Sequence, residues 1–205
     1  MENHSAGNRK REILEAALSA FSVNGYEATG LSELADAVGI RKASLYSHFT
    51  GKRDILETLL KEMNDRYEER SLFANADKLP ERIAAQTPEE LENTIREQLL
   101  LILHDPDISR VRRLLTIEQF RDPALARLHT RMSYENVLDY NTRLMKAFIA
   151  LGVLRDEDPV IMAAQFAWPI SKWVELCDRE PERESEIAVL ISRHIRQFMR
   201  LYGRE

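Results

Sequence analysis

The segment from Gly39 to Lys52 contains the side chains of this chain that are best suited to contact a nucleic acid. Lysine donates to guanine, serine can bond to several bases, and an alanine methyl group can contact the methyl group of thymine. Tyrosine and histidine are long enough to reach the oxygens of a DNA backbone. The candidate DNA-contacting side chains in this segment are Arg41, Lys42, Ala43, Ser44, Tyr46 and His48.

Two further residues are placed to bind phosphate groups. Lys52 follows Gly51 at the expected start of a helix, where free backbone N–H groups favour an anion. Thr29 stands just before another predicted helix and offers a hydroxyl group beside backbone amides. The sequence therefore predicts one phosphate contact at each of these two residues.

A helix, a glycine turn and a second helix must hold these side chains in place. Residues 31–38 have the apolar spacing of an amphipathic helix, and Thr29 is a suitable cap for it. Gly39 permits a tight turn, and Leu45 and Phe49 anchor the second helix. This pattern is typical of a helix-turn-helix, which places its second helix in the major groove of DNA. The alternative is a solvated helical hairpin without a ligand.

The composition predicts an all-helical protein whose attraction to DNA is local. Five of the seven glycines lie within the first 51 residues, whereas every proline lies at Pro80 or beyond. The net charge is −5, and the first 55 residues carry seven basic and seven acidic side chains. Because the remainder of the chain is acidic, only cations gathered on one face could attract DNA.

The cysteine content and the N-terminus predict a cytoplasmic protein. Cys177 is the single cysteine, which excludes an internal disulfide bond and fits a reducing compartment. The polar N-terminus lacks the apolar core of a signal peptide. Apolar runs such as Leu99 to Leu103 are too short to span a bilayer, so we expect no membrane partner.

Helical periodicity extends along most of the chain. A helix is predicted over residues 9–23, ended by Gly25 in the left-handed conformation. Another is predicted from Lys52 to near Asn75, followed by a loop over 76–87. Prolines and caps open the later helices, which are predicted near 88–104, 107–121, 123–151, 159–178 and 182–202.

Residues 9–60 resemble the DNA-binding domain of the tetracycline-repressor (TetR) family of transcriptional regulators. The resemblance rests on Ile13-Leu-x-x-Ala17, Phe21, Gly25-Tyr26, Ala28-Thr29, Leu34-Ala35, Val38-Gly39-Ile40, Ser44-Leu-Tyr-x-His-Phe49 and Lys52-x-x-Ile55-Leu56. Gly30 departs from the pattern where family members often carry a hydroxyl group, and Arg41 could compensate as an added cation. The resemblance implies the family's DNA contacts at Lys42, Ala43, Ser44, Tyr46, His48 and, on a phosphate, Lys52.

The resemblance also implies a second, helical domain that binds a small effector and pairs two subunits. We therefore expect a DNA-binding domain at residues 1–52 and an effector-binding and dimerisation domain at residues 53–205. The last two predicted helices carry apolar stripes that two subunits could share in a four-helix interface, with a monomeric core as the alternative. The implied function is a ligand-responsive repressor that binds a pseudo-palindromic operator as a homodimer.

The effector is expected to be small and hydrophobic or amphipathic. Pro169 should kink or break its helix and could open a cavity, although a kink without a ligand fits the sequence as well. Stripes of methionine and aromatic residues also fit an ordinary core. The candidate effector-binding residues are Met132, Tyr134, Asn141, Met145, Phe166, Trp168 and Trp173.

An enzyme and an architectural DNA-binding protein are the two alternative classes of function. The five histidines show no metal-binding spacing, and the chain has neither a phosphate-binding glycine loop nor a Gly-x-Ser-x-Gly elbow. We therefore expect no enzyme activity, no catalytic residue, no metal and no cofactor. A ligand-independent architectural or cell-division protein that binds DNA through the same fold is the second alternative.

Overall fold

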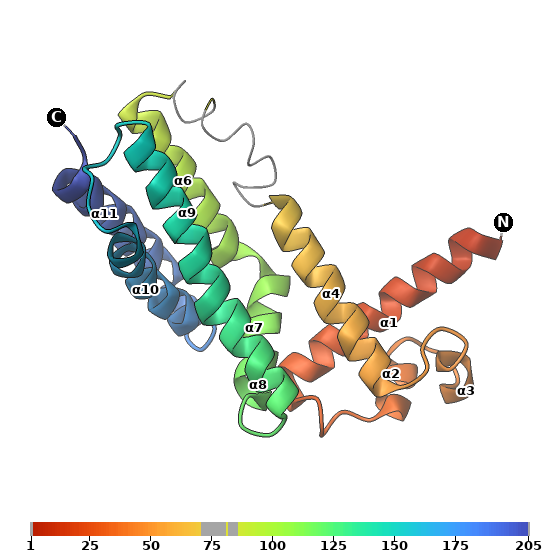
Figure 1. Ribbon diagram of the computed structural model, residues 1–205. Helices are drawn as coiled ribbons and strands as arrows, with labels where there is room; N and C mark the ends of the chain where they lie inside the picture. The colour runs from red at the N-terminus through yellow and green to blue at the C-terminus, as the bar shows by residue number, and fades with distance from the viewer. Residues whose placement is uncertain (1, 71–80, 82–85, 205) are drawn as a thin grey trace. The chain divides into compact units, whose positions relative to one another are not determined.

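The computed structural model describes residues 2–70, 81 and 86–204, and these residues confirm the predicted all-helical class (Figure 1). One isolated bridge, between Leu154 and Gly203, accompanies the helices in the described ranges. The predicted helix end near Asn75 and most of the predicted loop over 76–87 lie outside the described residues.

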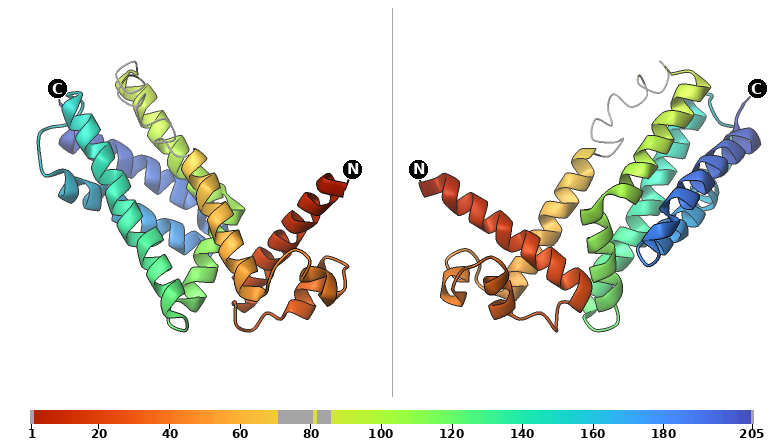
Figure 2. Two further views of the ribbon diagram at one scale, coloured as in Figure 1. Left: turned by 45° about the vertical axis from the view of Figure 1, so that its right-hand side comes forward. Right: turned by 180° about the vertical axis from the view of Figure 1, so that it is seen from behind.

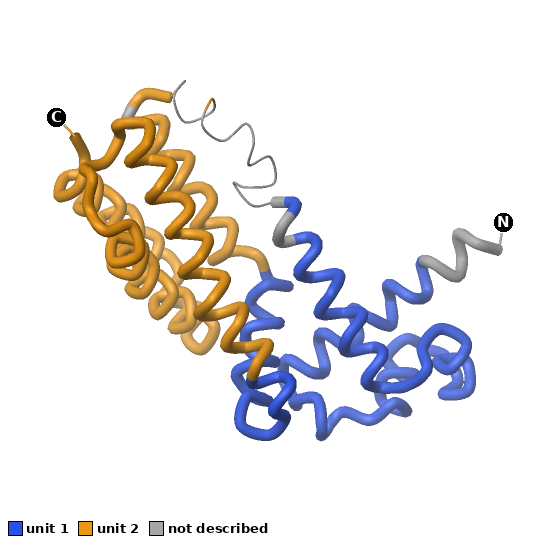
Figure 3. Tube along the Cα trace, viewed as in Figure 1, with its two compact units in different colours: residues 1–69, 106–126 blue, residues 70–105, 127–205 orange. Residues whose placement is uncertain are grey.

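The chain forms two compact units, which Figure 3 distinguishes by colour. The first unit comprises residues 1–69 and 106–126, and the second comprises residues 70–105 and 127–205. Each unit therefore combines segments that are separated in the sequence. The functional division at residue 52 stays a prediction.

The first unit is built around α1 (Glu2–Asn24), which packs against α2 (Leu31–Ala37) and α7 (Pro106–Glu118). The short α3 (Lys42–Leu45) packs against α2, and α4 (Lys52–Arg70) follows it. Helix α1 begins earlier than the predicted residue 9. The buried core of this unit includes Ile13, Leu14, Ala17, Leu18, Phe21, Leu34, Leu45, Phe49, Ile55, Leu56, Leu59, Val111, Leu114 and Leu115.

Glycines at two turns have the left-handed conformation that the sequence predicts. Gly25 ends α1 with φ of +86°, and Gly39 follows α2 with φ of +67°. The Gly39 N–H donates to the Asp36 carbonyl over 3.0 Å, and the next N–H, of Ile40, donates to Ala35 over 3.0 Å. The tight turn of the predicted helix-turn-helix is therefore confirmed.

The two glycines offer a matched pair for a stability measurement. Gly39→Ala should lower the free energy of unfolding by about 1 kcal/mol, because only the backbone conformation opposes a side chain there. Gly25→Ala should lower it by about 2–3 kcal/mol, since the added Cβ would also lie 2.7 Å from Glu118 Oε1. Urea unfolding followed by circular dichroism measures both values. If both variants lose the same free energy of unfolding, the close approach to Glu118 does not contribute to the effect of Gly25→Ala.

The second unit is a bundle in which α10 (Pro159–Cys177) packs against α6 (Pro88–His104), α9 (Asn136–Ala150) and α11 (Glu184–Tyr202) (Figure 2). The predicted helix over 123–151 is divided into α8 (Pro123–Thr130), a π-helical turn η2 (Arg131–Glu135) and α9, and the short turn η3 (Pro181–Arg183) precedes α11. Its core includes Leu91, Ile95, Leu144, Met145, Phe148, Met162, Phe166, Ile170, Val174, Ile187, Ile191, Ile195 and Phe198.

The sequence predicts a kink or a break at Pro169, and the structure contains no break there. Helix α10 runs without interruption from Pro159 to Cys177, with Pro169 inside it. Proline removes one backbone hydrogen bond, and burial of the neighbouring Phe166 and Ile170 holds the helix against the bundle. Within the described ranges, the helices lack the combination of length and apolar character that a membrane span requires.

Candidate nucleic-acid interface

The second helix of the motif is shorter than the sequence predicts. Helix α3 ends at Leu45, and a turn continues to Phe49, whose N–H donates to the Leu45 carbonyl over 3.0 Å. The side chains of Leu45 and Phe49 are 1% and 3% exposed. These two apolar anchors therefore hold the segment from residue 41 to residue 49 against the core, as predicted.

The remaining side chains of this segment face solvent. Tyr46 is 54% exposed, and His48 is partly buried. Among the described residues, neither the two cations nor the Tyr46 hydroxyl has an ion-pair or hydrogen-bond partner in the protein. Their polar groups are free to bind a ligand. The exposed residues of this segment include Arg41, Lys42, Ala43, Ser44 and Tyr46, whereas His48 is less exposed.

Helix α1 adds Lys10, a cation that is not among the predicted DNA contacts. The Lys10 ammonium group lies over the Phe49 ring, 5.4 Å from its centroid. The neighbouring Arg9 guanidinium pairs with Glu12 and also donates to the Val38 carbonyl over 3.3 Å. Nothing in the spacing of residues 9–11 could have indicated this proximity, because it depends on how α1 packs against the motif.

Thr29 does not occupy the predicted phosphate-binding position. Its side chain is fully buried, and its hydroxyl group donates to the Gly25 carbonyl over 2.9 Å. The cap of α2 is Gly30, whose N–H donates to the Glu33 carboxylate over 3.4 Å. Thr29 therefore satisfies a carbonyl at the end of α1, and we exclude its hydroxyl from the interface.

Lys52 also departs from its predicted role. Its ammonium nitrogen lies 2.8, 3.2 and 3.1 Å from the carbonyl oxygens of Tyr26, Glu27 and Thr29. An ammonium group has three N–H donors, so these bonds use all of them. The same nitrogen lies 4.4 Å from the centroid of the Tyr26 ring. A phosphate could bind Lys52 only by displacing a carbonyl, and we exclude it from the interface.

The start of α4 carries a carboxylate as well. Asp54 accepts hydrogen bonds from the Thr50 N–H over 2.8 Å and from the Thr50 hydroxyl over 3.1 Å. The bond from the backbone N–H is the main cause that lowers the pKa of Asp54. The protein itself thus supplies an anion at the N-terminus of this helix, which makes a bound phosphate there less favourable.

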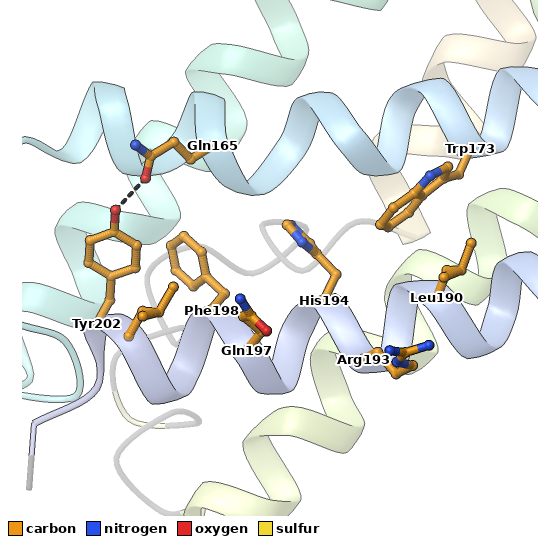
Figure 4. A pocket seen from close by; sticks show the side chains of 9 residues that line it. Gln165, Trp173, Leu190, Arg193, His194, Gln197, Phe198 and Tyr202 are labelled. Carbon is orange, nitrogen blue, oxygen red and sulfur yellow. Dashed lines mark hydrogen bonds between the residues drawn. The ribbon is translucent and has the colours of Figure 1, made fainter.

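A groove lies along α10 and α11, with a volume of about 320 Å³ (Figure 4). The His194 ring lies near Trp173, with a centroid separation of 5.6 Å, and its Nε2 is 3.0 Å from the Phe166 carbonyl. The Tyr202 hydroxyl donates to Gln165 at the other end. The lining residues are Gln165, Trp173, Leu190, Arg193, His194, Gln197, Phe198, Leu201 and Tyr202.

The seven predicted effector residues lie in several different surroundings. Met145 and Phe166 are part of the buried core, and Trp173 lines the groove of α10 and α11. The Tyr134 and Trp168 rings stack on each other, with centroids 5.1 Å apart. The other two are the partly buried Met132 and the buried Asn141, whose amide donates to the Val137 carbonyl. The apolar stripes predicted the burial of Met145 and Phe166 but did not reveal which residues face each other.

Two families of known sequences match the chain. Residues 13–59 match the family described as "Bacterial regulatory proteins, tetR family". Residues 89–204, more than half of the chain, match the "AefR-like transcriptional repressor, C-terminal domain". The chain belongs to the TetR family of transcriptional regulators. TetR-family regulators bind DNA, typically as dimers.

Individual relatives agree with this assignment over the helix-turn-helix. The chain is 44% identical over 52 residues to the biofilm operon icaADBC HTH-type negative transcriptional regulator IcaR of Staphylococcus aureus. That match covers 25% of this chain and 28% of the relative. The chain thus spans little more than a quarter of the curated TetR-family relatives that it matches.

Solved structures extend the fold comparison to almost the whole chain. A TetR-family regulator from Mesorhizobium loti is 21% identical, with a TM-score of 0.68 over 97% of this chain and 98% of that chain. The flavonoid-responsive regulator FrrA is 21% identical, with a TM-score of 0.63 over 97% of this chain and 99% of that chain. Both units therefore have the TetR-family fold.

Proposed function

We propose that this protein is a transcriptional repressor that binds a pseudo-palindromic operator as a homodimer and releases it when a small effector binds. The main support is the exposed face of the helix-turn-helix, where the polar groups of Arg41, Lys42 and Tyr46 have no partner among the described residues. Lys42, Ala43 and Ser44 would contact base edges in the major groove.

Phosphate contacts would come from the edges of this face. We assign them to Arg41, Tyr46 and His48, and we add Lys10 because its ammonium group lies beside Phe49. Phosphate contacts fix the register of the helix on the duplex, whereas base contacts supply sequence specificity. The few cations involved fit a protein whose net charge is −5, because attraction to DNA is then confined to this face.

The second copy of the chain would pack on α10 and α11. Two apolar side chains on α11, Val189 and Leu201, are 58% and 54% exposed. Side chains four residues apart lie on the same face of a helix. On α11, one such row is formed by residues 189, 193, 197 and 201. Three of these four residues line the groove, which supports covering this face with a partner's equivalent helices.

We propose that the second unit binds the effector. The match to a repressor C-terminal domain and the fold shared with FrrA, which is described as flavonoid-responsive, support an effector for this chain. The stacked Tyr134 and Trp168 rings are the best placed of the predicted aromatic residues, because Tyr134 is 54% exposed. An effector can release DNA only if it binds the DNA-incompetent state more tightly.

Selection of bound sites from random DNA tests the proposed function. The selected sequences should form an inverted repeat whose half-sites are about one helical turn, ~10 bp, apart or a multiple of this spacing. Failure to enrich any sequence would contradict the proposal. An architectural protein of the same fold would instead bind many unrelated sites and respond to no effector.

A further inference from the structure

A carboxylate at the end of α7 is buried and accepts a backbone N–H group, a role that an apolar residue could not fill. The Glu118 side chain is fully buried, and its Oε1 accepts the Tyr26 N–H over 2.8 Å. The Arg121 guanidinium is 3.8 Å from the same oxygen. The second oxygen, Oε2, is buried and has no hydrogen-bond partner among the described residues. Burial of a charge with incomplete pairing is costly, so a function other than packing must explain it.

Glu118 contacts the segment that leads directly into the helix-turn-helix. This segment, residues 25–29, joins α1 to α2 and is named the 25–29 turn below. Gly25 allows the close approach, because a Cβ there would lie 2.7 Å from Glu118 Oε1. The carboxylate thus binds the backbone of the turn, and its contact does not depend on the Tyr26 side chain.

Lys52 contacts the same turn through the opposite kind of backbone group. Whereas Glu118 accepts the Tyr26 N–H, Lys52 donates to the carbonyls of Tyr26, Glu27 and Thr29. One charged side chain therefore comes from α7 and the other from the first turn of α4. Next to Lys52, Arg53 pairs with Asp122 over 2.7 Å, which also links the start of α4 to the residues after α7.

The two charged residues lie on the helices whose chain continues into the second unit. A single residue separates the end of α6 from the start of α7, and α4 ends at Arg70, where the second unit begins. We propose that Glu118 and Lys52 are positioning residues that fix the 25–29 turn, and with it the helix-turn-helix, to α7 and α4. This inference rests on the proposed function. Loss of either residue would leave the DNA-contacting side chains intact but let the motif turn relative to these helices.

Changing the spacing between the two half-sites distinguishes a positioning role from a general effect on the stability of the protein. In a dimer with rigidly held motifs, one base pair inserted between the half-sites should weaken binding by about tenfold or more. Glu118→Leu keeps a similar volume but removes the acceptor, and Lys52→Met removes the charge from a side chain of similar length. In both variants the inserted base pair should weaken binding by only about threefold or less. Glu118→Gln retains an acceptor oxygen, so in this variant the inserted base pair should weaken binding almost as much as in the parent.

The salt dependence of binding distinguishes this role of Lys52 from the phosphate contact that the sequence predicts. Lys52→Met should leave the slope of log affinity against log salt unchanged. A slope reduced by about one per lost contact would assign Lys52 to a phosphate and overturn its positioning role. An unchanged spacing penalty in a folded Glu118→Leu dimer would overturn the role of Glu118.

Hydrogen exchange provides a test that does not depend on DNA binding. In the parent dimer the Tyr26 amide should exchange slowly, and in Glu118→Gln it should exchange several-fold faster, because a neutral acceptor bonds more weakly. Peptides from α10 and α11 should exchange as in the parent, and equal exchange at Tyr26 would contradict the inference. This readout decides the matter if Glu118→Leu fails to fold. If the parent protein binds no DNA but its Tyr26 amide exchanges slowly, the proposed function is wrong and the contact between Glu118 and the Tyr26 amide is still supported.

Discussion

Tyr46→Ala should weaken binding to the selected operator by about 1–3 kcal/mol for each subunit that contacts DNA, the scale of one good contact. Tyr46 is 54% exposed, and its hydroxyl group has no partner in the described protein. Its removal should therefore cost little stability and act mainly on the complex. Fluorescence anisotropy with a labelled duplex measures the change.

Phe120→Ala is the matched control for this prediction. Phe120 is an aromatic residue of the same compact unit and is 91% exposed, but it lies outside the proposed interface. The control should bind the operator as tightly as the parent. If Tyr46→Ala and Phe120→Ala bind equally well, the exposed face around α3 does not read DNA.

Joint replacement of Val189 and Leu201 by glutamate should produce a monomer and weaken operator binding by at least about 100-fold, since the two half-sites are then no longer bound together. Both side chains are exposed in the single chain, so the free monomer should fold normally. In the proposed dimer they would lie in an apolar interface, where unpaired carboxylates are strongly unfavourable. Analytical ultracentrifugation at micromolar concentration gives the oligomeric state.

Val23→Glu controls for the added charge. Val23 is 71% exposed on α1, in the other compact unit, and this variant should remain a dimer. A doubly substituted protein that still sediments as a dimer would show that subunits pair through another surface. Circular dichroism would establish that each variant keeps its helices.

The parts of the fold that were predicted correctly depend on interactions between residues close in the sequence. The conformations of Gly25 and Gly39 follow from turns at helix ends. Helix α6 starts with a capping box in which Thr87 and Glu90 bond to each other's backbone N–H groups. Helix α10 starts at the cap Asp158, which accepts two N–H groups. Such local signals fix helix types and starts whatever the tertiary packing.

The parts that were missed depend on partners far away in the chain. Glu118 lies 92 residues from Tyr26, and in the sequence it resembles an ordinary solvated residue near a helix end. Lys52 bonds to carbonyl groups 23 to 26 residues away. Backbone acceptors leave no pattern of side chains, so the sequence favoured a phosphate for Lys52. The same limit applies to the effector residues, because apolar stripes on separate helices do not reveal which helix faces pack together.

A competition experiment shows whether the exposed residues of α3 and its flanks recognise a DNA sequence. The parent dimer is titrated onto the selected operator in the presence of a duplex with the same base composition in shuffled order, at about 0.15 M salt. The operator should be bound at least about 1,000-fold more tightly than the shuffled duplex. Equal affinity for both duplexes would contradict this prediction, because the protein would then recognise only the charge of DNA.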